Sequence, residues 1–304
     1  MKFGLMIASA GAPSLDDVLD QFVQAEKRGF ASAWIPSVRS YDALAVIALA
    51  GRLTSTLEMA TFVVPTYPRH PSALTEQALT TQAATGGRLT LGIGLSHRVS
   101  MEGRLGLDWD HPVRHLREYL SCLTPLLRGE AVTFSGEEFT LDQAQVTVPG
   151  VTAPSVLVAA LGPQLLRLTG RLADGTAVWM GGPRYLAEHA VPTISAAASA
   201  AGRPAPRIVA GTPICVTDSA DAVRERANRA FGRYGELPSY RAVLDRQQEG
   251  ASPADVALIG DEATVLAGIE AYRAAGVTDL VASVYAPRGE DAERTYALLK
   301  SHMA

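Results

Sequence analysis

The residues best suited to chemistry follow a long apolar run. The stretch GGRLTLGIGLSHR, residues 86–98, leads from a glycine pair to Ser96, His97 and Arg98. An imidazole titrates near neutral pH, so His97 can donate a proton or a hydrogen bond to a substrate. Gly92 and Gly94 form a G-x-G, but the dinucleotide fingerprint needs a third small residue where His97 stands. The stretch therefore predicts a strand that delivers polar side chains into a site, rather than a phosphate loop.

Other polar and aromatic residues also directly follow apolar runs. They are Ser9, Ser37, Thr66, Tyr67, Trp179 and Met180. Each alone is compatible with an ordinary role in a turn or in packing. If the runs are parallel strands of a barrel, their carboxyl ends share one face and the side chains converge there. We therefore predict a ligand site at the strand ends, with Tyr67, Trp109 and Trp179 in the substrate pocket.

The segment LVAALGPQLLRLTG, residues 157–170, is a second chemical signal. Pro163 suits the first position of a helix, because the amide that proline lacks has no helical partner there. The amides around Leu161, Gly162 and Gln164 would then lie at the N-terminus of this helix, where they can bind an anion. A Gly-Pro pair is also an ordinary turn between strand and helix, and the sequence leaves both interpretations open.

The elements that position these residues alternate regularly along the chain. Short apolar runs predict buried parallel strands, and the longer segments between them have helical periodicity. About eight such units favour a closed barrel, with a doubly wound open sheet as the alternative. A hairpin at 131–141 and a less regular span at 232–256 interrupt this alternation of strands and helices. The predicted strands are 3–7, 32–36, 59–65, 88–95, 155–161, 175–180, 207–217 and 279–287, and the predicted helices are 15–28, 42–53, 72–84, 112–128, 164–172, 185–201, 220–231 and 263–275.

Composition narrows the classes of protein. Of 304 residues, 47% are hydrophobic and 19% charged, which provides a core and argues against disorder. A formal net charge of −4 argues against a protein that coats nucleic acid. Cys122 and Cys215 have no metal-ligand or C-x-x-C spacing, so we expect core thiols in a reducing cytoplasm and no metal site. With no low-complexity linker, residues 1–304 are expected to form a single domain.

The first residues, MKFGLMIASAGAP, resemble a signal peptide, because they combine a lysine, an apolar stretch and an A-x-A-like cleavage site. The apolar stretch is shorter than a typical signal sequence and has one basic residue, which favours a first buried strand. No run of about 20 apolar residues predicts a membrane span.

Two segments carry a resemblance to a known family. The stretch RHPSALTEQALTTQAATGGRLTLGIGLSHR resembles the R-x-P helix and G-G-R-x-x-L-G-x-G of the luciferase-like monooxygenase superfamily. The segment LVAALGPQLLRLTGRLADG is similar to the cofactor-phosphate segment of its bacterial members that use the deazaflavin coenzyme F420. The resemblance implies a (β/α)8 TIM barrel with insertions after strands 4 and 7, a hairpin before strand 5 and a homodimer.

The resemblance also implies roles for particular residues. The bulge of the third strand, which often holds a non-prolyl cis peptide against the ring, falls at Thr61-Phe62. The phosphate amides fall at Ala160, Leu161 and Gly162, and His97 is the residue that approaches the reactive ring position. Further cofactor contacts are expected from Ser37 and Ser96.

The chain departs from the relatives that act on sugar phosphates. Those have Asp-His after strand two and a lysine after strand six, where this chain has Ser37-Val38 and Gly181-Gly182. This argues against a phosphorylated sugar as the substrate and removes the histidine acid or base of the second strand.

The expected function is hydride transfer between F420 and an uncharged, partly apolar small molecule. His97 is the first choice for the proton donor or the orienting group, although it could also only line the pocket; His70 and His111 are weaker candidates. An FMN-dependent monooxygenase and a flavin-binding barrel without turnover remain alternatives. A barrel lyase or hydrolase is disfavoured, because the sequence shows no strand-end lysine and no metal-type cluster.

Overall fold

The continuous apolar runs form eight parallel strands that close into a barrel. The structure is a computed structural model and describes residues 1–37 and 40–303. Strands pair in chain order, and β12 pairs with β1 to close the ring. The closed ring confirms the TIM barrel over the open sheet. The barrel strands are β1 (Lys2–Met6), β2 (Ser32–Ile35), β3 (Glu58–Thr61) continued by β4 (Val64–Pro65), β5 (Leu89–Gly94), β8 (Ser155–Val158), β9 (Gly175–Trp179), β10 (Arg207–Val216) and β12 (Asp279–Val284).

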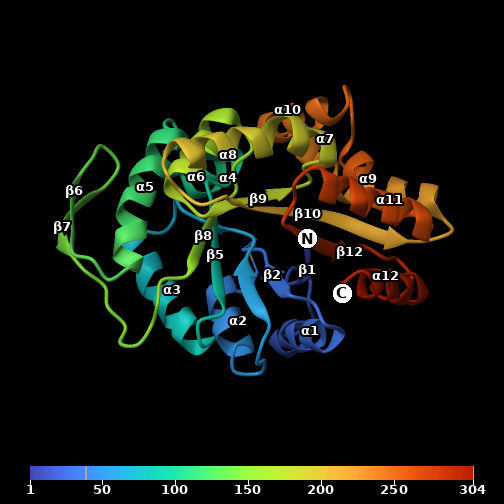
Figure 1. The fold of residues 1–304 in the computed structure, drawn as a ribbon, viewed down its shortest axis with the longest axis horizontal. Coiled ribbons are helices and arrows are strands. Elements are labelled where there is room, and N and C mark those ends of the chain that lie inside the picture. The colour runs from blue at the N-terminus through green and yellow to red at the C-terminus, as the bar shows by residue number, and fades with distance from the viewer. Residues whose placement is uncertain (38–39, 304) are drawn as a thin grey trace.

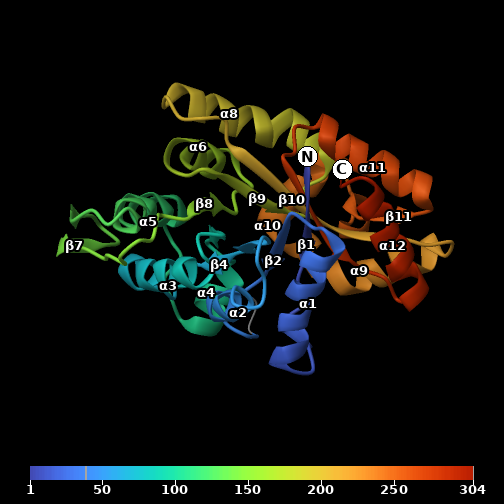
Figure 2. The same ribbon diagram turned by 60° about the horizontal axis from the view of Figure 1, so that its bottom comes forward.

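Helices follow the strands and surround the barrel (Figure 1, Figure 2). The first helix shows why the sequence folds in this way: the Ser14 side chain accepts a hydrogen bond from the Asp17 amide, and Gly29 ends the helix in the left-handed conformation. The surrounding helices are α1 (Leu15–Arg28), α2 (Ala43–Ala50), α3 (Pro71–Ala84), α5 (Pro112–Leu127), α6 (Pro163–Leu172), the continuous run α7 (Pro183–Tyr185), η1 (Leu186–Ala190) and α8 (Val191–Ala200), α11 (Glu262–Ala274) and α12 (Gly289–Ser301).

Both predicted insertions are present, at the fourth and seventh barrel strands. After β5 the chain forms α4 (Arg98–Leu105) before α5, and the hairpin β6 (Val132–Ser135) and β7 (Thr140–Ala144) extends away from the barrel (Figure 1). After β10 it forms α9 (Ala220–Glu236), α10 (Pro238–Gln247), η2 (Pro253–Val256) and β11 (Leu258–Gly260).

Three details differ from the sequence-based expectation. The span 232–256 is mostly helical, because α9 continues through Gly232 and α10 begins at Pro238, where proline suits the first helical position. The predicted third strand is split in two, and its cis peptide joins Phe62 and Val63, one residue later than expected. The last helix, α12, was not predicted; its Tyr296 ring packs beneath the guanidinium of Arg28 at 4.0 Å.

Charged groups close the amino-terminal end of the barrel. Arg207, the first residue of β10, donates to Glu58 at 2.5 Å and to Asp279 at 2.7 Å. The hydroxyl of Thr90 donates to Glu58, and the hydroxyl of Thr278 donates to Asp279. The carboxylates are thus paired and hydrogen-bonded, as buried charges require.

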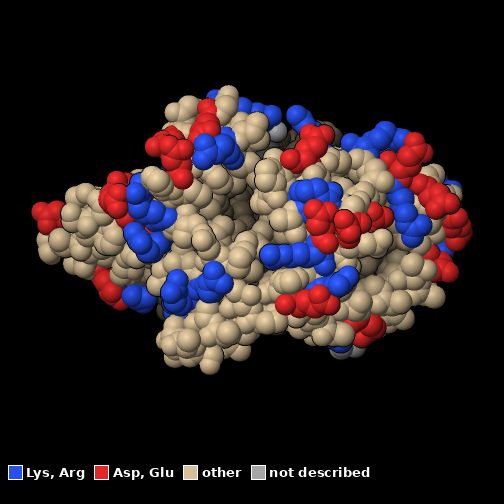
Figure 3. All heavy atoms as spheres, turned by 90° about the horizontal axis from the view of Figure 1, so that it is seen from above, with Lys and Arg blue, Asp and Glu red and all other residues tan. Residues whose placement is uncertain are grey.

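The surface carries charges of both signs. Figure 3 shows Lys and Arg side chains interspersed with Asp and Glu over one face, which is hollowed near its middle. Of the helices in the described residues, none is long and apolar enough to span a membrane.

Candidate active site

The two glycines of β5 make room for the split third strand. A Cβ on Gly92 would lie 2.1 Å from the carbonyl oxygen of Thr61, and one on Gly94 would lie 2.7 Å from Val63. The Thr61 hydroxyl donates to the Gly92 carbonyl and accepts from the Gly92 amide. The G-x-G therefore serves close packing of two strands at the cis peptide. Because the Thr61 hydroxyl is used within the protein, its contact with a cofactor stays a prediction.

Aromatic rings fill the barrel above its charged end. The Phe62 ring meets Trp34 and Trp179 edge to face, with centroids 5.7 and 6.3 Å apart. Gly211 of β10 leaves space for both neighbours, since a Cβ there would lie 2.9 Å from Phe62 and 3.0 Å from Trp179. The barrel thus presents an apolar floor at its carboxyl-terminal mouth.

Two strand ends turn sharply at this mouth. Ser96 after β5 has a φ of 62°, and Met180 after β9 has a φ of 54°. Non-glycine residues rarely adopt this left-handed region, and such residues cluster at functional sites. The turn at Ser96 precedes His97, which is the N-cap residue of α4.

His97 is half-buried at the mouth, and burial lowers its pKa below the ordinary value of 6.5. The imidazole is therefore neutral at pH 7. Its ring lies 5.7 Å from that of Tyr240, a buried residue of α10. Tyr240 could not be predicted from the sequence, because nothing local connects the seventh-strand insertion with the fourth strand.

A stack of rings surrounds Tyr67, which follows β4. The Tyr67 ring lies flat on His115, with centroids 3.8 Å and planes 4° apart, and 6.2 Å from Trp109. His115 is hydrogen-bonded to the Thr66 hydroxyl at 3.0 Å, and burial lowers its pKa to about 4. Sequence reasoning missed His115, whose only local signal is an apolar-face position in its helix. His115 therefore supports the Tyr67 ring, and the place of Tyr67 and Trp109 in a substrate pocket stays a prediction.

Free amides precede α6, which begins at Pro163. Among the described residues, the amides of Leu161, Gly162 and Gln164 donate to no other protein group. Gly162 is half-buried, and a Cβ added to it would meet no described atom within 4 Å. Ala160 is fully buried, and its amide likewise donates to no described protein group, so the phosphate contact predicted for Ala160 stays a prediction. The geometry matches that of an anion site at a helix start.

A family model described as luciferase-like monooxygenase matches residues 1–279. The chain belongs to this family. It is 30% identical to a 5,10-methylenetetrahydromethanopterin reductase of Archaeoglobus fulgidus, over 92% of this chain and 93% of the relative.

Two solved structures share the fold of this luciferase-like chain. One is an F420-dependent secondary alcohol dehydrogenase in complex with an F420-acetone adduct, with a TM-score of 0.82, 18% identity and coverage of 100% and 99%. The other is the oxygenating constituent of 3,6-diketocamphane monooxygenase from Pseudomonas putida in complex with FMN, with a TM-score of 0.76, 19% identity and coverage of 100% and 98%.

The mouth residues of this family member fit a ring cofactor with a phosphate tail. The free amides before α6 suit the phosphate, and Phe62 and Trp179 offer an apolar surface for a ring. The indole nitrogen of Trp179 is buried without a hydrogen-bond partner within residues 1–37 and 40–303, and so is the Ser9 hydroxyl. Buried donors normally have a partner, so these atoms mark places where a bound group could supply one.

Ser37 is half-buried after β2. Val38, its neighbour in the family comparison, lies outside the described residues. The cofactor contact predicted for Ser37 stays a prediction.

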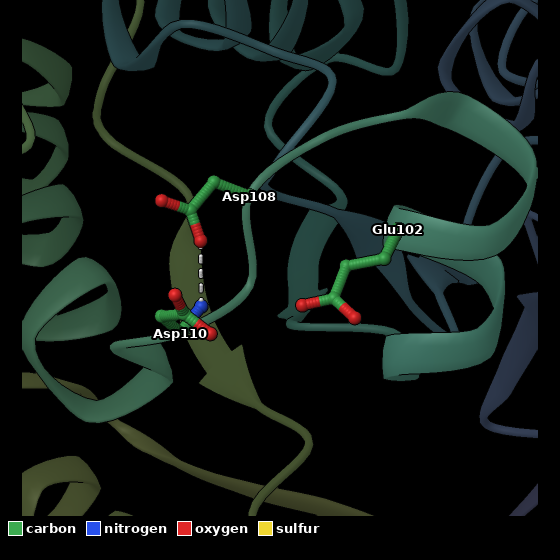
Figure 4. Close-up of side chains that lie close together, drawn as sticks. All are labelled: Glu102, Asp108 and Asp110. Atoms are coloured by element: carbon green, nitrogen blue, oxygen red, sulfur yellow. Dashed lines mark hydrogen bonds between the residues drawn. The ribbon is translucent and has the colours of Figure 1, made fainter.

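Three carboxylates gather after β5, in α4 and in the loop that follows it. Figure 4 shows Glu102, Asp108 and Asp110, whose oxygens lie within 4.8 Å of one another. Arg98 pairs with Glu102 at 2.7 Å and with Asp110 at 3.4 Å, and lies 5.5 Å from the Trp109 ring. The cluster therefore has its own cation, and its chemistry is that of an exposed ion-pair group that orders the loop around Trp109.

Proposed function

We propose that the protein is an oxidoreductase that transfers a hydride between coenzyme F420 and a small organic substrate. The observation that carries the proposal is the open segment of free amides before α6, which offers the coenzyme phosphate a binding position. Likeness to an F420-dependent dehydrogenase supports the deazaflavin.

A bound deazaflavin would supply the hydride chemistry, so the protein has to bind the ring, exclude water and handle a proton. Leu161, Gly162 and Gln164 would bind the phosphate, and the aromatic floor would exclude water from the ring. His97 would donate a proton or a hydrogen bond to the substrate.

The walls favour an uncharged, partly apolar substrate. Tyr67, Trp109 and Tyr240 are aromatic, and the nearby guanidinium of Arg98 is already paired with carboxylates. A charged substrate would leave water without gaining a free counter-ion, which is unfavourable.

F420 is expected to bind more tightly than FMN. The reason is the similarity of the segment around Gly162 to that of deazaflavin users. Titration of the purified protein with each cofactor, followed by ring fluorescence, measures the two dissociation constants. Equal or tighter binding of FMN, with oxygen uptake that depends on substrate, would instead establish a monooxygenase.

The FMN-dependent monooxygenase is the second candidate function, because an FMN complex shares the fold. A flavin-binding barrel without turnover is the third, and it predicts cofactor binding with no hydride transfer to any carbonyl tested. A homodimer and a cytoplasmic location remain predictions.

Gly162→Leu is expected to weaken F420 binding by tenfold or more, which corresponds to about 1.4 kcal/mol per factor of ten. The new side chain would cover the free amides, and because its Cβ would meet no described atom within 4 Å, the melting temperature should change little. Isothermal titration and thermal unfolding measure the two effects.

Gly289→Leu is the matched control, because Gly289 also lies at the amino-terminal end of a helix, as the first residue of α12, and has open space around it. It should leave F420 binding unchanged. If Gly162→Leu lowers only the melting temperature, the Gly-Pro pair is a plain turn.

A further inference from the structure

Gln247, the last residue of α10, connects two separate parts of the mouth. Its side-chain oxygen accepts hydrogen bonds from the amides of Arg184 at 2.9 Å and Tyr185 at 3.3 Å. These amides lie at the start of the helical run after β9. The side chain therefore fastens the seventh-strand insertion to the sixth barrel unit.

The space for this side chain exists because residue 182 is a glycine. A Cβ on Gly182 would lie 2.3 Å from the oxygen of Gln247 and 2.4 Å from its amide carbon. Gly182 belongs to the Gly181-Gly182 pair, which stands where the resemblance places a lysine in the sugar-phosphate relatives. In this chain the position is filled by a side chain from α10.

The helix that Gln247 fastens carries part of the substrate wall. Tyr240 and Leu244 of α10 are buried in one cluster with Met180, and Leu161 and Trp179 pack against that cluster. The Tyr240 ring also lies 5.7 Å from the His97 ring, tilted by 54°. Displacing α10 would thus open the pocket next to His97.

Tyr185 extends the connection to the phosphate segment. Its ring is fully buried, and its hydroxyl donates to the carbonyl of Leu161 at 2.6 Å. The same residue therefore offers its amide to Gln247 and its hydroxyl to the segment of free amides. Hydrogen bonds run from Leu161 through Tyr185 to Gln247.

We infer that Gln247 is a positioning residue that docks α10 over the mouth, and that Tyr185 couples this docking to the phosphate segment. The coupling rests on the proposed cofactor function. The docking by Gln247 does not, since it concerns the protein without any ligand.

Hydrogen exchange of residues 238–247 tests the docking in the free protein. Gln247→Ala removes an acceptor from two amides, and Gly182→Ala displaces the same acceptor without altering Gln247. Each should speed exchange in α10 by about tenfold, the effect of losing hydrogen bonds that hold a local element. Gln247→Glu keeps an acceptor and should restore exchange to within about twofold of the original rate.

Gln248→Ala is the matched control. Gln248 is the neighbouring glutamine, it is exposed, and in the part of the chain that the structure describes its side chain has no hydrogen bond. In Gln248→Ala the amides of α10 should exchange at the wild-type rate. Two results would overturn the docking role. One is an exchange rate of α10 in Gln247→Ala equal to that of the wild-type protein, and the other is an exchange rate in Gln247→Glu as fast as in Gln247→Ala.

The coupling is tested by adding F420. In the original protein F420 should slow exchange both at 160–166 and in α10. Tyr185→Phe keeps the buried ring but loses the hydroxyl, so F420 should still protect 160–166 while protection of α10 falls severalfold. Either of two outcomes would disprove the coupling. F420 could protect α10 from exchange as strongly in Tyr185→Phe as in the wild-type protein, or F420 could protect only residues 160–166 in the wild-type protein. Absence of F420 binding at 160–166 would refute the proposed function and with it the coupling, while the free-protein experiments would still decide the role of Gln247.

Discussion

His97→Ala is expected to slow hydride transfer by about 10²- to 10⁴-fold, the usual contribution of general acid–base catalysis. Folding and F420 binding should survive, because the side chain is half-buried and makes no hydrogen bond to any described residue. Single-turnover kinetics of the F420-loaded enzyme measure the loss. His111→Ala is the control, since His111 is exposed before α5 and makes no side-chain capping bond there.

His97→Gln distinguishes a proton donor from an orienting group. Glutamine donates a hydrogen bond but does not titrate, so an orienting role predicts that most activity remains. Full activity in His97→Ala would contradict both roles and direct the search to Tyr67 or to bound water.

The pH dependence separates the same two roles. Burial lowers the pKa of His97 below 6.5, so the imidazolium is lost as pH rises through that lowered pKa. A proton donor then predicts a rate that increases as pH falls from 8 toward the lowered pKa. A neutral orienting group predicts a constant rate over that range.

The barrel could be predicted from the sequence because buried parallel strands leave uninterrupted apolar runs. In β5 all six residues are buried, so the run LTLGIG is readable without knowing its neighbours. The residues alone did not locate the cis peptide, since it depends on how two strands meet; the family resemblance placed it one residue early, at Thr61-Phe62. Gly92 is the local signal that could have located it, because its missing side chain shows where another backbone approaches.

The site was predictable only in part, for a related reason. His97, Tyr67 and Trp179 lie at strand ends, where position along the chain already indicates their face. Tyr240 and Gln247 belong to the span 232–256, for which the sequence predicted no regular element. Pro238 suits the start of a helix, but the packing of α10 against the mouth depends on residues far away in the chain, and only the folded chain reveals it.

Arg207→Met should lower the free energy of unfolding by about 3 kcal/mol, because removing one partner from a largely buried ion pair leaves uncompensated charge. Glu58 and Asp279 would lose the guanidinium they share at the amino-terminal end of the barrel. Urea denaturation measures the change. Arg203→Met is the control: Arg203 pairs with the more exposed Asp174 at 2.9 Å, and such surface pairs contribute at most about 1 kcal/mol.

The comparison of Arg207→Met with His97→Ala also tests whether the two ends of the barrel have separate roles. Arg207 lies at the start of β10 and His97 follows the end of β5, so the aromatic layer of Trp34 and Phe62 separates them. Arg207→Met, assayed well below its melting temperature, should therefore retain F420 affinity and turnover, whereas His97→Ala should lose turnover and retain stability. A loss of F420 affinity in Arg207→Met at a temperature where the protein is folded would show that the charged end also shapes the mouth, through the strands that join them.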